Sequence, residues 1–242
     1  SYDYEQPVSK SARQLSQISS QLLASPTSPR IALVGHSMGG LVAREWTENE
    51  SLRDARIAAL FTIGAPHGGS NWAALPPLLD LVTPGRFDVN DVIDVVMHQP
   101  SSAGLRDLKP DSPFLRQLSA RGRRADVAYT TIVGTGSPID QDQVAQIRDL
   151  LRALDRDGSV VRLVRPRIEP LLGSFDELSR GKGDGVVAAT NATIHGVDDI
   201  VTVDLSHFEM VRRIPGRSDH PVWKVVADRL LNLPRNAASS GP

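Results

Sequence analysis

The chain has 242 residues, of which 40% are hydrophobic and 23% charged, so it is expected to form one large or two small globular domains. Its net charge of −1, with no basic patch or tail, argues against nucleic acid or an anionic membrane as partner. Without cysteine it has no disulfide, thiol nucleophile or thiolate metal site, and its richest apolar run, Leu75–Val82, is broken by prolines and predicts no transmembrane segment.

The first predicted elements are a helix over 9–23 and a short strand over Ile31–Val34. The helix carries apolar residues at helical spacing, which predicts one buried face; they are Leu15, Ile18, Leu22 and Leu23. The strand is fully apolar, a pattern typical of a parallel sheet with both faces covered.

A glycine-rich turn, GHSMGG over Gly35–Gly40, joins this strand to a predicted helix over Leu41–Asn49. Glycines beside Ser37 allow a strained turn that lifts the serine hydroxyl out of the sheet. The helix amino terminus then directs N–H groups toward whatever the serine attacks. We therefore predict that Ser37 is a nucleophile; a purely structural glycine turn is the alternative.

Strands and helices alternate through the rest of the chain, which predicts βαβ units and a largely parallel sheet. A proline-rich stretch from 72 to 124 is expected to be an excursion over the sheet, and 160–168 is a weak strand candidate. The remaining predicted elements are strands at Ile57–Ile63, Val127–Val133 and Ile200–Leu205 and helices at Gln143–Leu154 and Val222–Leu231, before a disordered tail.

A serine nucleophile needs a base, and the chain offers six histidines. His207 follows a predicted strand by two residues, where a loop can return its side chain to the serine, and His195 is the next candidate. His67 lies in a glycine loop and is a candidate pocket residue, whereas His36, the neighbour of Ser37, is expected to be a packing residue.

The base needs a carboxylate to fix its tautomer, and Asp184 stands between two glycines that let the backbone turn its short side chain inward. A solvent-exposed turn aspartate is the alternative, in which case Asp140 or Asp142 would serve. The backbone N–H of Met38 supplies one oxyanion donor; the chain has no glycine before Gly35 for a second donor loop.

These motifs resemble the lipase and esterase branch of the α/β-hydrolases, including bacterial lipases, lecithin:cholesterol acyltransferase-like and GPI inositol-deacylase-like enzymes. The matching segments run in the family order: 35–44, 64–69, 107–115, 183–187 and 206–207. The resemblance implies a mostly parallel sheet flanked by helices, a triad of Ser37, Asp184 and His207, an oxyanion contact from Met38, and a helical lid over an acyl-binding cleft.

On this basis the expected division is hydrolase core over 1–70, cap or lid over 71–125, core with the acid and histidine loops over 126–233, and tail over 234–242. The family has strands and an oxyanion loop before the helix that precedes the serine turn, and these are missing here. We therefore expect an N-terminally truncated fold, with a missing segment or a partner chain covering the edge of Ile31–Val34.

The favoured function is cofactor-independent hydrolysis of carboxylic esters. The predicted substrate-binding residues are His67, Leu75, Leu78 and Leu79. The three leucines are suited to a lipid-like acyl chain. The alternatives are acyl transfer by the same triad and a non-catalytic hydrolase-like interaction module. No metal is expected, because the sequence has no metal-binding motif. A nucleotide enzyme is not expected either, because the P-loop spacing is absent. The compartment is open, with a soluble cytoplasmic protein slightly favoured.

Overall fold

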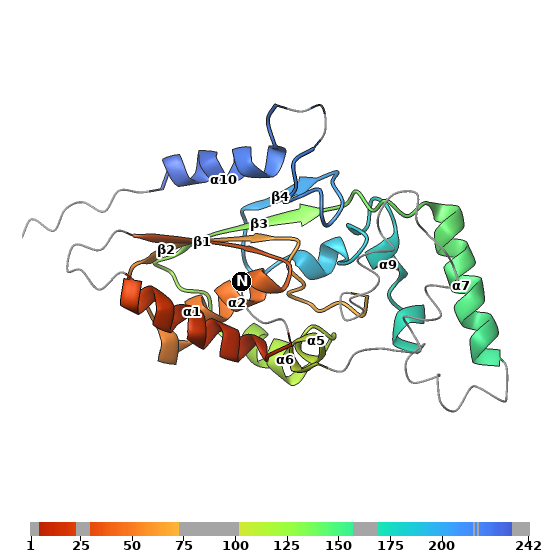
Figure 1. Ribbon diagram of the computed structural model, residues 1–242, viewed down its shortest axis with the longest axis horizontal. Coiled ribbons are helices and arrows are strands. Elements are labelled where there is room, and N and C mark those ends of the chain that lie inside the picture. The colour runs from red at the N-terminus through yellow and green to blue at the C-terminus, as the bar shows by residue number, and fades with distance from the viewer. Residues whose placement is uncertain are drawn as a thin grey trace, which may run out of the picture.

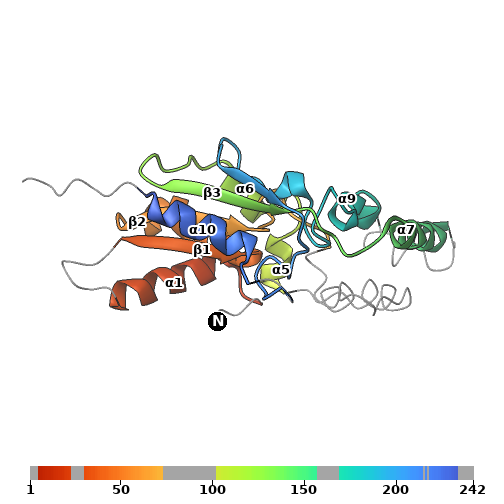
Figure 2. The ribbon, with the colours of Figure 1, turned by 90° about the horizontal axis from the view of Figure 1, so that it is seen from above.

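The computed structural model describes residues 5–22, 30–72, 102–156, 169–214, 216 and 218–233. Within them, four parallel strands form one sheet in the order β1 (Ile31–His36), β2 (Ile57–Ile63), β3 (Ala128–Gly134) and β4 (Ile200–Val203). Helices cover both faces of this sheet, so the fold has three layers (Figures 1 and 2). The predicted α/β class with a mostly parallel sheet is confirmed.

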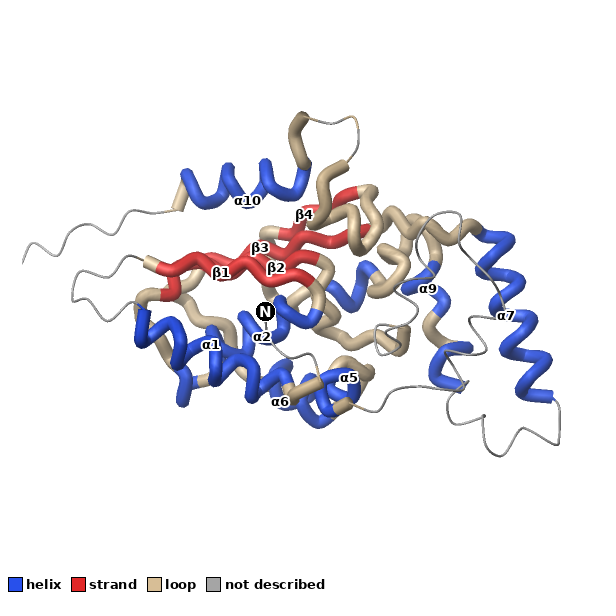
Figure 3. Tube along the Cα trace, viewed as in Figure 1, coloured by secondary structure: helices blue, strands red, loops and turns tan. Residues whose placement is uncertain are grey.

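One face of the sheet is covered by α2 (Met38–Glu48), with α1 (Val8–Leu22) packed beside it. The short helices α5 (Ala103–Asp107) and α6 (Pro113–Ser119) lie in the same layer (Figure 3). They place leucines in the core that Leu41 and Trp46 of α2 also form.

The opposite face is covered by α10 (Pro221–Leu231) (Figure 1). Val222 and Val226 of this helix are buried against Phe61 of β2 and Ile132 of β3. Burial on both faces explains why every residue of β2 is buried and why all but Thr62 are apolar.

The carboxyl ends of the strands all lie at one edge of the sheet, because every pairing is parallel. Beyond that edge the structure places α7 (Gln141–Arg156) and α9 (Phe175–Leu178) (Figures 1 and 2). The 3-10 helices η1 (Glu50–Leu52) and η2 (Ala189–Ala192) complete the described elements. The strands and long helices predicted after the serine turn are therefore present, with ends shifted by a few residues.

The prediction of a buried apolar face on the first helix is wrong. Leu15, Ile18 and Leu22 are 37%, 52% and 77% exposed, and Leu23 lies outside the described residues. The helix instead buries Val8 and its neighbours at positions 11 and 12, because only its first turns lie against the core.

The strand β1 is likewise not covered on both faces. Ala32 is exposed and Val34 is 42% exposed, whereas Leu33 and Gly35 are buried. The reason is its place in the sheet: β1 pairs with β2 alone among the described strands, and α10 packs against the strands further along.

Several predictions fall outside the described residues, namely Leu75, Leu78, Leu79, the candidate strand over 160–168 and the tail over 234–242. The division into core and lid stays a prediction, although 103–119, within the expected lid, contributes leucines to the main core. Among the described helices none is long and apolar enough to cross a membrane.

Candidate active site

Ser37 occupies the turn between β1 and α2 in a strained backbone conformation, with φ 53° and ψ −130°. The turn is tight because small residues allow it: a Cβ on Gly35 would lie 2.5 Å from the oxygen of Gly39. A Cβ on Gly40 would lie 2.5 Å from the Cβ of Ala65, after β2. These positions therefore require glycine, and they hold the serine at the carboxyl edge of the sheet.

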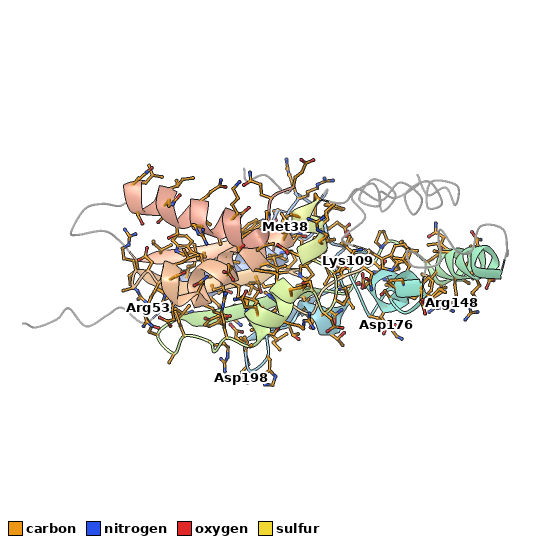
Figure 4. All side chains as sticks on the ribbon, turned by 90° about the horizontal axis from the view of Figure 1, so that it is seen from below. Met38, Arg53, Lys109, Arg148, Asp176 and Asp198 are labelled. Carbon is orange, nitrogen blue, oxygen red and sulfur yellow. The ribbon has the colours of Figure 1, made fainter. Side chains whose placement is uncertain are left out.

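The first turn of α2 starts directly after the serine, with Met38 as its first residue (labelled in Figure 4). An N–H at this position has no partner within the helix and points out of its amino end. Together with the positive end of the helix dipole, it is a ready donor for an oxyanion formed at Ser37.

Asp184 is almost completely buried, with 1% of its surface exposed. Its Oδ1 atom accepts hydrogen bonds from the backbone N–H groups of Val186 and Val187, at 2.9 and 2.7 Å. This turn leaves Oδ2 facing inward, so the alternative of a solvent-exposed turn aspartate does not describe the structure.

The free oxygen of Asp184 lies 2.8 Å from Nδ1 of His207, which is itself buried. The backbone joins the two residues again, because the N–H of His207 donates to the carbonyl of Asp184 at 2.9 Å. An Nδ1–H donated to the carboxylate leaves Nε2 as the proton acceptor, which is the tautomer that a general base needs.

The Asp184–His207 pair lies against the carboxyl ends of β2 and β3. A Cβ on Gly64 would lie 3.0 Å from Oδ2 of Asp184, and a Cβ on Gly134 would lie 2.8 Å from its Cβ. The Cε of Met210 lies beside both glycines. Because glycine has no side chain, Gly64 and Gly134 leave room for the carboxylate of Asp184 and the imidazole of His207 at these strand ends.

Ser37 reaches the same edge, since its N–H donates to the carbonyl of Ile63, the residue before Gly64. His36 also connects the serine turn to the loop of His207. Its Nε2 lies 2.9 Å from the backbone carbonyl of His207, and the ring centroids of the two histidines are 4.6 Å apart. The hydroxyl of Ser37 makes no capping hydrogen bond to α2.

Burial, and next the neighbouring His207, lower the pKa of His36 to about 4. His36 is therefore neutral near pH 7. The expectation that it is a packing residue is consistent with its contacts, which support the backbone of the histidine loop.

The alternative residues lie elsewhere. Asp140 accepts the N–H of Gln143 and caps α7, Asp142 is exposed, and His195 is exposed on the loop after η2. Ser37, Asp184 and His207 thus lie at the same edge of the sheet, and the hydrogen bond of Asp140 to α7 does not involve any of them.

His67 is buried and contacts the hydroxyl of Thr62 through Nε2, at 3.2 Å. Burial, and next the positive charge of Arg44, lower its pKa well below the usual value. His67 and His195 line a cavity of about 510 Å³ whose lining does not include Ser37. A role of His67 in binding the substrate stays a prediction.

Glu177 is a buried acidic residue beside the loop of Asp184 that the sequence does not single out. It lies on α9, and its buried carboxyl group contacts the segment after His67, 70–72. Its backbone carbonyl accepts the N–H of Gly185, in the loop 183–187 that carries Asp184 and is called the acid loop below. A single glutamate outside any recognised motif gives no sequence signal of burial. The described residues hold no cluster of three or more side chains suited to a metal ion.

Comparison with known proteins gives one family match: residues 11–83 match the PGAP1-like alpha/beta domain. No curated protein matches the chain. The solved structure of Bacillus licheniformis lipase BlEst2 in its propeptide form is similar over 98% of this chain and 43% of its own, with 16% identity and a TM-score of 0.53.

Two further structures are more distantly similar. The mature form of the same lipase matches 84% of this chain and 68% of its own, with 16% identity and a TM-score of 0.47. The phospholipase PlaB from Legionella pneumophila matches 80% of this chain and 36% of its own, with 18% identity and a TM-score of 0.49. The chain thus spans less than half of the propeptide-form lipase and of the phospholipase.

Proposed function

We propose that this chain, an α/β-hydrolase by its fold and its motifs, cleaves carboxylic esters through an acyl-enzyme formed on Ser37. The observation that carries the proposal is the buried pair of Asp184 and His207, 2.8 Å apart, at the sheet edge where the serine turn also lies. Neither residue alone would indicate catalysis, but a buried carboxylate holding an imidazole tautomer beside a strained serine is suited to acyl transfer.

In the first step, Oγ of Ser37 attacks the ester carbonyl carbon while Nε2 of His207 takes the hydroxyl proton. The carbonyl oxygen becomes an oxyanion, which the N–H of Met38 is placed to stabilise. When the tetrahedral intermediate collapses, the C–O bond to the alcohol breaks and His207 returns the proton to the departing oxygen.

In the second step, a water molecule attacks the acyl-enzyme and gives its proton to His207. Collapse releases the carboxylic acid, and the proton returns to Ser37. Asp184 stays ionised throughout and stabilises the imidazolium that forms twice in the cycle.

For the substrate, we propose an ester with a lipid-like acyl chain, cleaved without a cofactor. Support comes from the apolar residues of the expected lid, Leu75, Leu78 and Leu79, which are suited to contact an acyl chain. The similar lipase fold agrees with this choice. A series of 4-nitrophenyl esters from acetate to palmitate tests it: a maximum at acetate would contradict a lipid-like acyl group.

A fluorophosphonate probe tests the nucleophile directly, because it reacts with serine only where a base activates the hydroxyl. We expect one adduct, on Ser37 by peptide mass spectrometry, lost in Ser37→Ala and in His207→Ala. The matched controls are Ser51→Ala, an exposed serine, and His195→Ala, which should label like wild type. An adduct on another serine, or no adduct on a folded protein, would contradict the proposal.

A further inference from the structure

Glu177 presents a carboxyl group to the interior, with only 2% of the residue exposed. Three consecutive residues after the loop 64–69 contact this carboxyl group. Ser70 Oγ lies 2.5 Å from Oε2. The N–H of Trp72 donates to Oε2 at 3.1 Å, and the N–H of Asn71 donates to Oε1 at 3.2 Å. None of the ion pairs among the described residues involves Glu177. It is a buried acid held by hydrogen bonds alone.

The same residue also borders the loop that carries Asp184. The carbonyl of Glu177 accepts the N–H of Gly185 at 3.0 Å, and a Cβ on Gly183 would lie 2.4 Å from that carbonyl. Ser70 completes the connection, because its Oγ lies 2.7 Å from the carbonyl of Val186, whose N–H donates to Asp184.

The proton count at Ser70 selects one protonation state of Glu177. A hydroxyl has one proton, yet Oγ of Ser70 faces both Oε2 of Glu177 and the carbonyl of Val186. An ionised Glu177 makes both of these atoms acceptors, so the single proton of Ser70 can serve only one of them. A protonated Glu177 donates to Ser70, and Ser70 then donates to Val186. The neutral acid satisfies both of these contacts of the Ser70 hydroxyl, and burial disfavours the charge.

We propose that Glu177 is a positioning residue which, in its neutral form, ties the segment 70–72 to the acid loop and so holds Asp184 in place for His207. The contribution to catalysis rests on the proposed function; the tie itself does not. When Glu177 ionises, the proton of Ser70 turns to the carboxylate, the carbonyl of Val186 loses its donor, and the acid loop loosens.

Burial, the largest cause, and the charge of Asp184 raise the pKa of Glu177, while the hydrogen bonds from Ser70, Trp72 and Asn71 lower it; together these effects place the pKa at about 7. The other charged groups near α9 are at its surface: Asp176 pairs with Lys182, and Arg148 of α7 stacks on Phe175 (Asp176 and Arg148 are labelled in Figure 4). The switch between the two states of the tie therefore falls near neutral pH.

The first experiment needs no enzyme activity. In a 1H–15N NMR titration of wild type from pH 5.5 to 8.5, the backbone amides of Asn71 and Trp72 should shift with a midpoint near 7. In Glu177→Gln, which keeps a donor toward Ser70 and cannot ionise, this transition should be absent. Asp176→Asn, one residue away on the same helix and exposed, should titrate like wild type. Wild-type amides that do not titrate would overturn the proposal.

The second experiment uses ester hydrolysis. If only the neutral form of Glu177 holds Asp184, kcat of wild type at pH 8.5 should be roughly thirty-fold below its limiting value. At this pH, 1.5 units above a pKa of about 7, only about one molecule in thirty carries a protonated Glu177. Glu177→Gln should lose this alkaline decline at unchanged KM, with a moderately lower kcat because Trp72 loses an acceptor. A decline that persists in the variant would overturn the proposal.

The two experiments separate the two ideas. A titration at Trp72 in a chain without esterase activity would reject the proposed function and keep the tie. If Glu177→Gln does not fold, the wild-type titration still decides. Ser70→Ala gives a second test, because it removes the hydroxyl that links Glu177 to the carbonyl of Val186. This variant should lower kcat at pH 6.5 to the wild-type value at pH 8.5.

Discussion

Replacing Asp184 by asparagine tests whether the carboxylate fixes the tautomer of His207. The amide oxygen can keep the place of Oδ1 and accept the N–H groups of Val186 and Val187. The amide nitrogen then faces Nδ1 of His207, 2.8 Å away, and donates to it. Nδ1 must become the acceptor, the ring proton moves to Nε2, and Nε2 can no longer take the proton of Ser37.

The expected loss is about four orders of magnitude in kcat, by analogy with the same substitution in other serine triads. Since each tenfold change corresponds to about 1.4 kcal/mol, the variant loses roughly 5.5 kcal/mol of transition-state stabilisation. Stability should change by only about 1 kcal/mol, because the two backbone hydrogen bonds survive and the third becomes a weaker bond between two neutral groups.

The assay is kcat on a soluble ester, with urea unfolding on the same preparation. The matched control is Asp140→Asn, which changes an exposed helix cap at the same sheet edge and should retain wild-type kcat. A folded Asp184→Asn variant within tenfold of wild type would refute the assignment of the acid. Loss of folding without loss of activity per folded molecule would refute the tautomer argument.

Three further predictions concern stability. Gly35→Ala should lower it by about 3 kcal/mol in urea unfolding, because a Cβ there would lie 2.5 Å from a backbone oxygen; a neutral effect would contradict the close packing of the turn. Arg44→Ala should cost about 3–5 kcal/mol, since it leaves Glu48 buried without its partner, whereas Arg53→Ala at an exposed pair should cost under about 1 kcal/mol; equal costs would contradict the argument. The pKa of His36, lowered to about 4, means that unfolded chains bind a proton first as pH falls, so stability should drop by on the order of 3 kcal/mol between pH 6.5 and 4. His36→Gln should remove that part of the pH dependence, and an unchanged profile would contradict it.

The sequence predicts the site through features that are local in the chain. The serine turn is identified by its glycines and flanking apolar residues, and Asp184 by glycines on both sides. His207 is identified by its distance from a strand end. Each follows from the backbone freedom of glycine or from the geometry of parallel strands, which a few neighbouring residues specify.

Features that depend on distant contacts could not be predicted. Glu177 is buried because three residues more than a hundred positions earlier bind it, and nothing in its own neighbourhood indicates this. The apolar residues of α1 have the spacing of a buried face, but spacing does not say whether another element lies opposite. The same limit applies to β1.

The acid and the base are joined twice, once through their side chains and once through their backbones. Any movement of the loops that carry Asp184 and His207 would therefore displace the two residues as a unit. The separation between His207 and Ser37 can then change only as far as the contact between Nε2 of His36 and the carbonyl of His207 allows. Activity should then follow that one separation, with the proton-accepting state of the imidazole preserved at every point along it.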